Sequence, residues 1–267
     1  MRAFGKWIGR ILLALILAAV VVGIWKREEI QRLLAVNSLF SEEKIVDNFS
    51  NMDAAFLTTP LSRGAGPVSD LPLGPQAKLP EETAHWIRDR AVTSLLVMKD
   101  GEIRSEDYFL GTGADDRRIS WSLAKSYLSA LFGVLMEEGA ITSLDAPVIT
   151  YAPTLKGSAY DTATIRNVLN MASGVTFDED YLDYDSDINR MGRVVALGGA
   201  LDDFTASITD SFAAPGETWQ YVSIDTHVIG MVIRGATGRS IPDLLSEKIL
   251  QPLGLEHEGY YVTDGAG

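Results

Sequence analysis

The chain has 267 residues, enough for one large or two small domains, and 46% of them are hydrophobic, which suffices for a buried core. Its formal net charge of −13 argues against nucleic-acid binding, because nucleic-acid binders concentrate positive charge. It contains no cysteine, which excludes disulfides, zinc–thiolate sites and a cysteine nucleophile.

The first predicted element is an apolar N-terminal segment. Residues 11–25 are uncharged and mostly apolar, and residues 7–10 extend the run to 19 residues, close to the ~20 that a spanning helix needs. A cleaved signal peptide is the alternative, but Lys26 and Arg27 follow the run where a small-residue cleavage site is expected. We therefore predict an uncleaved membrane anchor in residues 1–27, inserted through residues 8–25.

The charges around this segment predict its orientation. Six basic residues against two acidic ones give residues 1–34 a net charge of +4, so the rest of the chain carries −17. More positive charge precedes the apolar run than follows it, and the positive-inside rule then places the N-terminus in the cytoplasm. The sequence predicts a single-pass protein of the inner (cytoplasmic) membrane whose acidic body faces the periplasm or the cell exterior.

The middle of the chain is predicted to contain a tether followed by a β-hairpin. Residues 28–80 are interpreted as a linker and irregular N-terminal extension, because Pro, Gly and Ser gather in its second half. Residues 81–90 have the character of a short helix. Residues 93–98 and 103–110 read as two strands, and residues 99–102 form the turn that joins them into a β-hairpin.

A Ser-x-x-Lys tetrad opens the next amphipathic stretch. Ser122 and Lys125 are three residues apart, so on a helix they share a face and the amine can lie near the serine oxygen. The helix N-terminus offers free N–H groups and a positive dipole end, which suit a developing oxyanion. The alternative is an N-cap serine followed by a solvated lysine. Apolar residues at helical spacing up to Gly139 favour a serine that opens a packed helix.

The second half of the chain is mainly helical. In its acidic loop, residues 178–187, a calcium site is disfavoured because Ile188 and Val194 stand where a calcium loop needs Gly and Glu. No two histidines lie within metal-ligand spacing, and we predict neither a metal nor a cofactor. Tyr221 and Ser223 form a Tyr-x-Ser motif, and two further helices are predicted after it.

Five segments, in this order along the chain, share the pattern of one known group of enzymes: residues 121–126, 139–148, 164–174, 215–223 and 252–255. With them the chain resembles the serine β-lactamase/penicillin-binding-protein superfamily. Within it, the chain is similar to the class C β-lactamase-like hydrolases, which include esterases and 6-aminohexanoate-dimer hydrolases. The resemblance implies an α/β fold with an antiparallel sheet flanked by helices, a mainly helical lobe and the site between them.

The resemblance also implies roles for the motif residues. Ser122 corresponds to the nucleophile, Lys125 to the residue that helps deprotonate it, and Tyr221 to the one that passes the proton to the leaving group. Ser223 stands at a substrate-binding position where classical class C β-lactamases carry Asn. A hydroxyl has one donor where an amide has two, so recognition of the substrate is expected to differ.

The C-terminal part departs from the family pattern. The family places a Lys/His-Thr/Ser-Gly motif on a strand that lines the site, and residues 257–259 (His-Glu-Gly) mimic part of it. We expect no strand of usable length there and interpret this match as accidental. Residues 81–267 are thus predicted to form a hydrolase domain that lacks the family's C-terminal strands and last helix.

We therefore predict a serine hydrolase that cleaves small ester or amide substrates through an acyl-enzyme on Ser122. A penicillin-binding or peptidoglycan-related module with slow turnover and a non-catalytic binding descendant of the fold remain as alternatives. A Ser-His-Asp enzyme is disfavoured, because the chain has three histidines in unremarkable contexts and no Gly-x-Ser-x-Gly elbow. The predicted partners are a small-molecule substrate and a membrane, not nucleic acid.

Overall fold

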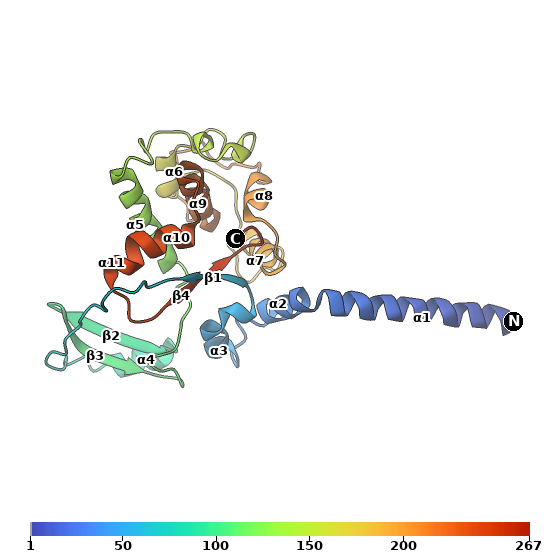
Figure 1. Ribbon diagram of the computed structural model, residues 1–267, viewed down its shortest axis with the longest axis horizontal. Coiled ribbons are helices and arrows are strands. Elements are labelled where there is room, and N and C mark those ends of the chain that lie inside the picture. Colours follow the sequence, from blue (N-terminus) through green and yellow to red (C-terminus); the bar gives the residue numbers. More distant parts are fainter. Residues whose placement is uncertain (1) are drawn as a thin grey trace.

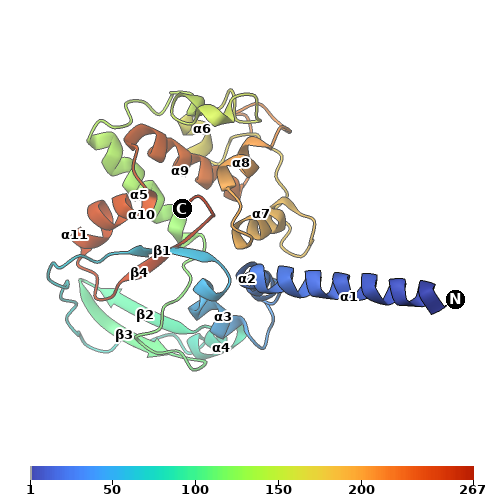
Figure 2. The ribbon, with the colours of Figure 1, turned by 45° about the vertical axis from the view of Figure 1, so that its right-hand side comes forward.

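The computed structural model describes residues 2–267, and its first helix, α1, extends away from the rest of the chain (Figures 1 and 2). Helix α1 (Arg2–Trp25) is followed by α2 (Arg27–Asn37). The large apolar side chains from Ile11 to Trp25 are each more than half exposed. Among the described residues no individual helix is both long and apolar enough to cross a membrane. Gly9–Trp25 and Arg27–Asn37 reach that length together, with a bend of 76° between them. The membrane anchor stays a prediction.

The N-terminal extension is more ordered than the sequence predicts. Residues 28–80 were expected to be irregular, but the part up to residue 61 contains α2, α3 (Ile45–Ser50), a 3₁₀ turn (Met52–Ala54) and strand β1 (Leu57–Leu61). Tertiary contacts order this part, because Leu39, Met52 and Ala55 are buried although their local sequence has no clear periodicity. Residues 62–80 contain no helix or strand, as their Pro and Gly content predicts.

The C-terminal residues contain a strand that the sequence did not predict. Strand β4 (Gly259–Thr263) begins within the 257–259 match and pairs antiparallel with β1, from Leu57 opposite Thr263 to Leu61 opposite Gly259. The expectation of no usable strand at this position is therefore wrong. The pairing partner lies about 200 residues earlier in the chain, and no local signal reveals such a distant partner.

The predicted hairpin is confirmed. Strands β2 (Ser94–Lys99) and β3 (Glu102–Tyr108) pair antiparallel with a bulge at Val97–Met98, and α4 (Thr83–Asp89) precedes them. Asp100 and Gly101 join the strands with φ values of 56° and 80°, the left-handed conformation that a two-residue hairpin turn requires.

The strands form two separate antiparallel pairs, β1–β4 and β2–β3, where the sequence predicted one sheet. In β1, Pro60 has no N–H and so cannot donate to a second neighbouring strand. The β2–β3 pair and α4 lie on one side of β1 and β4, and the helical lobe lies on the other (Figures 1 and 2).

The helical lobe contains the core and positions the site. Helix α5 (Leu123–Glu137) packs against α9 (Ser223–Thr237), and their buried side chains include Leu131, Leu135, Val228 and Val232. The remaining elements of the lobe surround this pair: 3₁₀ turns Val148–Thr150 and Pro153–Leu155, α6 (Ile165–Leu169), α7 (Asp187–Ala196), α8 (Leu201–Ala206), α10 (Ile241–Leu245), a π-helical turn (Ser246–Leu250) and α11 (Gln251–Leu253).

Helix α5 ends as its sequence predicts. Gly139 has a φ of 78°, Gly139 N–H donates to Met136 O, and Ala140 N–H donates to Leu135 O. These two bonds form a Schellman motif, which satisfies carbonyl groups left free at the end of a helix. The C-terminal end of α5 is therefore fixed, and its buried face packs against α9.

Candidate active site

Ser122 lies at the N-cap position of α5, but its side chain does not cap the helix. Its hydroxyl oxygen instead lies 2.7 Å from the phenolic oxygen of Tyr221 and accepts a hydrogen bond of 3.1 Å from Lys125 Nζ. An N-cap serine normally accepts from a backbone N–H of the first helical turn. Since this bond is absent from the described structure, the structure does not support the capping interpretation of Ser122.

Lys125 reaches Ser122 because the two residues lie one helical turn apart on α5. Its Nζ also lies 5.3 Å from the centre of the Tyr221 ring. Lys125 also borders a cavity of about 60 Å³, whose lining includes Leu128 and Ile229.

Tyr221 is placed by a loop that is bonded to the segment after α6. Gly216 N–H donates to Ala172 O at 2.7 Å, and Gln220 N–H donates to Met171 O at 2.9 Å. Gly216 has a φ of 91°, which favours glycine, and an added Cβ would lie 2.9 Å from the Asn167 side chain. These contacts bring Tyr221 to Ser122 across 99 residues of sequence.

The surroundings of Tyr221 favour its ionised form. Burial raises the pKa of this phenol, but hydrogen bonding to Ser122 and Lys125 and the positive charge of Lys125 outweigh burial, so the pKa lies below its usual value. A tyrosine with a lowered pKa is more often ionised near neutral pH, and only the ionised phenol can accept a proton there.

Ser223 begins α9, and a carboxylate that the sequence did not single out binds it. Its N–H donates to Glu179 Oε1, and its hydroxyl donates to Glu179 Oε2 at 3.1 Å. Glu179 therefore bonds the first N–H of α9 and lies at the positive end of that helix. Glu179 belongs to the acidic loop of residues 178–187, and no spacing rule connects positions 179 and 223.

A buried acid, Asp225, lies in the first turn of α9. Asp225 is fully buried, its Oδ1 accepts a 2.7 Å hydrogen bond from Tyr160, and its Oδ2 has no partner among the described residues. Burial raises the pKa of Asp225 to about 7, against the hydrogen bond from Tyr160 that lowers it, and the charge of Glu179 raises it further. Sequence reasoning missed Asp225 as well.

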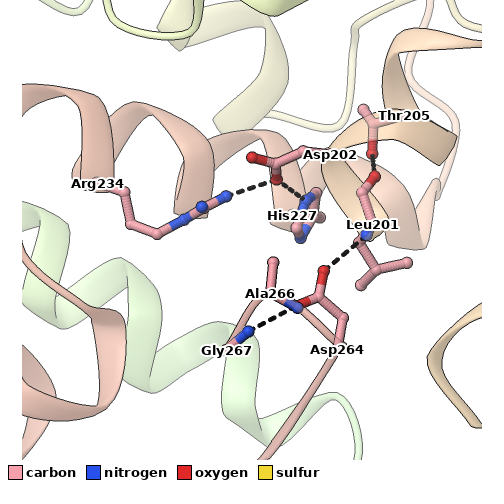
Figure 3. Close-up of polar contacts among 8 residues, drawn as sticks. All are labelled: Leu201, Asp202, Thr205, His227, Arg234, Asp264, Ala266 and Gly267. Atoms are coloured by element: carbon pink, nitrogen blue, oxygen red, sulfur yellow. Dashed lines mark hydrogen bonds and ion pairs between the residues drawn. The ribbon is translucent and has the colours of Figure 1, made fainter. Parts of the chain in front are cut away.

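The histidines take no part in this arrangement, and His227 belongs to a separate network (Figure 3). Its Nε2 lies 2.8 Å from Asp202 Oδ1, which also accepts from Arg234 at 2.5 Å. Asp264 accepts a hydrogen bond from Leu201 N–H at 2.6 Å, so the chain after β4 is tied to the start of α8. This network joins α8, α9 and the C-terminal residues.

The structure thus brings Ser122, Lys125 and Tyr221 within hydrogen-bonding reach and places Ser223 two residues beyond Tyr221. A hydroxyl, an amine and a phenol in contact can transfer a proton among them, which is what activation of a serine nucleophile requires. Their catalytic roles stay predictions at this point.

The chain is similar to known hydrolases in sequence. A family model described as Beta-lactamase matches residues 81–266. The 6-aminohexanoate-dimer hydrolase of Paenarthrobacter ureafaciens is 27% identical over 186 residues, which are 68% of this chain and 47% of that protein. Protein flp of Staphylococcus aureus (strain COL) is 25% identical over 189 residues, which are 64% of this chain and 35% of that protein. The chain spans about half or less of the length of these relatives.

Solved structures share its fold. A protein from Bacillus anthracis, named as a proposed 6-aminohexanoate-dimer hydrolase, superposes with a TM-score of 0.74 at 21% identity, covering 85% of this chain and 64% of that one. A protein from Bacteroides dorei DSM 17855, named as a proposed β-lactamase, gives a TM-score of 0.52 at 21% identity over 66% of this chain and 50% of that one. These similarities confirm the predicted α/β, β-lactamase-like fold.

Proposed function

Since the chain belongs to the Beta-lactamase family, we propose that it is a serine hydrolase that cleaves small ester or amide substrates through an acyl-enzyme on Ser122. One observation carries the proposal: the Ser122 hydroxyl makes no capping bond and contacts Tyr221 and Lys125 instead. A serine that only caps α5 has no need of either partner.

In the proposed reaction, Ser122 Oγ forms a bond to the carbonyl carbon of the substrate and its proton passes to the Tyr221–Lys125 pair. The tetrahedral intermediate then collapses, the bond to the leaving alcohol or amine breaks, and Tyr221 returns the proton to that group. Water then attacks the carbonyl carbon of the resulting ester, and the same pair accepts its proton. The bond to Ser122 Oγ breaks, the pair returns the proton to that oxygen, and the carboxylic acid leaves. The lowered pKa of Tyr221 supports its use as base and then as acid.

The start of α5 suits the oxyanion of that intermediate. Among residues 2–267, the N–H of Ser122 has no hydrogen-bond partner, and it lies at the positive end of a helix of 15 residues. A preorganised N–H of this kind contributes on the order of 10²–10³ in rate in other hydrolases. Ser223 remains the proposed substrate-binding residue, with its hydroxyl oriented by Glu179.

Initial rates on a panel of p-nitrophenyl esters, anilides and a chromogenic β-lactam test the proposal. We expect Ser122→Ala to abolish turnover. Ser126→Ala removes the same hydroxyl group from an exposed residue of the same helix and is expected to retain turnover. Unchanged turnover in Ser122→Ala would overturn the proposal. An acyl-enzyme that forms stoichiometrically and then persists would instead identify a penicillin-binding module with slow turnover.

The substrate class is proposed from chemistry and from the relatives. Attack by a serine on a carbonyl carbon serves esters and amides alike, and the Paenarthrobacter relative is named for hydrolysis of an amide dimer. We propose no cofactor, since the Ser122–Lys125–Tyr221 arrangement supplies the nucleophile and both proton transfers itself. Residues 81–267 form the proposed hydrolase domain.

We further propose that residues 8–25 attach the protein to the inner membrane with the hydrolase domain facing the periplasm or cell exterior. The exposed apolar side chains of α1 support attachment, because such a surface in water is unfavourable. Because the chain has no cysteine, a single cysteine introduced at exposed Asp53 reports on topology. We expect a membrane-impermeant maleimide to label it in cells with a permeabilised outer envelope but an intact inner membrane. Labelling only after lysis of the inner membrane would contradict this orientation.

A further inference from the structure

Trp121, the residue before the proposed nucleophile, has a backbone conformation that its side chain disfavours. Its φ is 44°, in the left-handed region where a bulky residue is strained. The conformation matters for Ser122, because Trp121 O accepts the hydrogen bond of Ala124 N–H at 3.0 Å and so begins the first turn of α5. A relaxed Trp121 would turn Ser122 away from its present position. Such a conformation persists only if surrounding contacts hold it.

Two phenylalanines supply those contacts. The ring of Phe40 stacks on Trp121 with centroids 5.6 Å apart and planes 21° apart. The ring of Phe49 meets the same indole edge-on at 5.2 Å and 67°, and the two phenyl rings contact each other at 6.0 Å. Both geometries are favourable for aromatic pairs. The indole is therefore held from two directions.

Backbone and side-chain hydrogen bonds fix the same segment. Ile119 N–H donates to Phe49 O at 2.9 Å, and Arg118 donates to Ser50 Oγ at 2.8 Å and to Val46 O. The segment that leads to Ser122 is thus attached to α3 by three hydrogen bonds.

The bracing residues come from a part of the chain outside the family match. Phe40 and Phe49 lie before residue 81, where that match begins. The helix that precedes them, α2, is itself docked on the helical lobe, because Arg32 Nε donates to Ala196 O at 2.8 Å. The N-terminal extension therefore contacts the lobe at one end and the approach to the nucleophile at the other.

From these contacts we infer that Phe40 and Phe49 are positioning residues, which hold Trp121 in its strained conformation and thereby orient Ser122 for attack. This inference rests on the proposed role of Ser122 as nucleophile. It gives the N-terminal extension a part in catalysis and makes it more than a tether between the membrane and the hydrolase domain.

The test compares variants of the 267-residue chain in detergent by the rate of fluorophosphonate labelling and by kcat and KM on an activated ester. Phe40→Ala and Phe49→Ala are each expected to lower the labelling rate and kcat about ten- to a hundredfold, the cost of a misplaced reacting group, with KM nearly unchanged. Phe40→Tyr keeps the stacked ring and is expected to restore the wild-type rate. The near-UV circular dichroism of the Trp121 cluster should weaken in the alanine variants only.

Phe56→Ala is the matched control, since it removes the same ring from the same segment and Phe56 makes no ring contact with Trp121 in the described structure. Trp121→Gly offers a second check, because glycine adopts a positive φ without strain and needs no brace. Phe49→Ala should therefore cost little in the Trp121→Gly background.

Three results would overturn the inference: an equal loss in Phe56→Ala, a rise in KM alone, or a full additive loss in the double variant. The first indicates general destabilisation, the second a substrate contact, and the third independent effects. A wild-type protein that is not labelled at Ser122 would instead contradict the proposed function, and the inference with it.

Discussion

Asp225 makes the stability of the fold depend on pH in a calculable way. In the folded chain its pKa is about 7 because the carboxyl is fully buried, against 3.8 for an ordinary aspartate. Each pKa unit corresponds to about 1.36 kcal/mol, so the ionised carboxyl costs the folded state about 4 kcal/mol relative to the unfolded chain. Because the pKa is higher in the folded chain than in the unfolded one, the fold escapes this cost below pH ~4, where the carboxyl is protonated in both states. The fold loses the corresponding free energy of unfolding as the pH rises through ~7. Roughly 2.5 kcal/mol of the loss falls between pH 5 and pH 8.

The perturbation is Asp225→Asn, which keeps the shape and the acceptor for Tyr160 but cannot ionise. Urea unfolding of the full chain in detergent, measured from pH 5 to pH 8, gives the free energy of unfolding of each variant. The wild type should lose roughly 2.5 kcal/mol over this range and Asp225→Asn much less. Asp185→Asn, at an exposed position, is the control and should follow the wild type. Equal pH dependence in wild type and Asp225→Asn would refute the account of Asp225.

Three further substitutions have defined outcomes. Tyr221→Phe should lower kcat by about 10²–10⁴-fold with little change in KM, because the substitution removes the oxygen that transfers the proton. Steady-state ester hydrolysis measures both constants, and an unchanged kcat would exclude a role of Tyr221 in proton transfer. Asp202 has its pKa lowered to about 2 by the hydrogen bond to His227, against the effect of burial, so its stabilisation is present above pH ~4 and is lost as pH falls toward 2. The side chain is about a third exposed, and solvent screening leaves about 1 kcal/mol of this stabilisation. Urea titrations at pH 2 and pH 7 should show the wild type's advantage over Asp202→Asn at pH 7, with most of it lost at pH 2. Gly235→Ala should destabilise the fold by about 1–3 kcal/mol in thermal unfolding, because the added Cβ meets the Tyr151 carbonyl oxygen; an unchanged Tm would contradict the close approach.

The elements that were predictable from the sequence are those specified by local chemistry. The hairpin turn at Asp100–Gly101 and the Schellman glycine at Gly139 each occupy a conformation that few other residues accept, and both occur as predicted. Ser122 and Lys125 share a helical face at fixed spacing, so their contact follows once α5 exists. Tyr221 was placed by the family resemblance, since no local rule brings it across 99 residues.

The features that were missed depend on contacts between distant segments. Strand β4 is short, and its partner β1 lies in a segment that reads as irregular, so neither was a clear strand on its own. Glu179 lies in a run of acidic residues whose usual place is the solvated surface, and only the fold brings it to Ser223. Asp225 lies in a helix, and acidic residues of helices are usually exposed. The sequence around Asp225 does not show that it is buried, because its burial depends on the packing of distant segments.

The most direct test of the proposed function is peptide mapping of the covalent adduct that the 267-residue chain forms with a fluorophosphonate. The account predicts a single adduct, located at Ser122, that is absent from Ser122→Ala and forms far more slowly in Lys125→Ala. Adduct formation at another residue, or at an undiminished rate in Ser122→Ala, would contradict the assignment of Ser122 as the nucleophile.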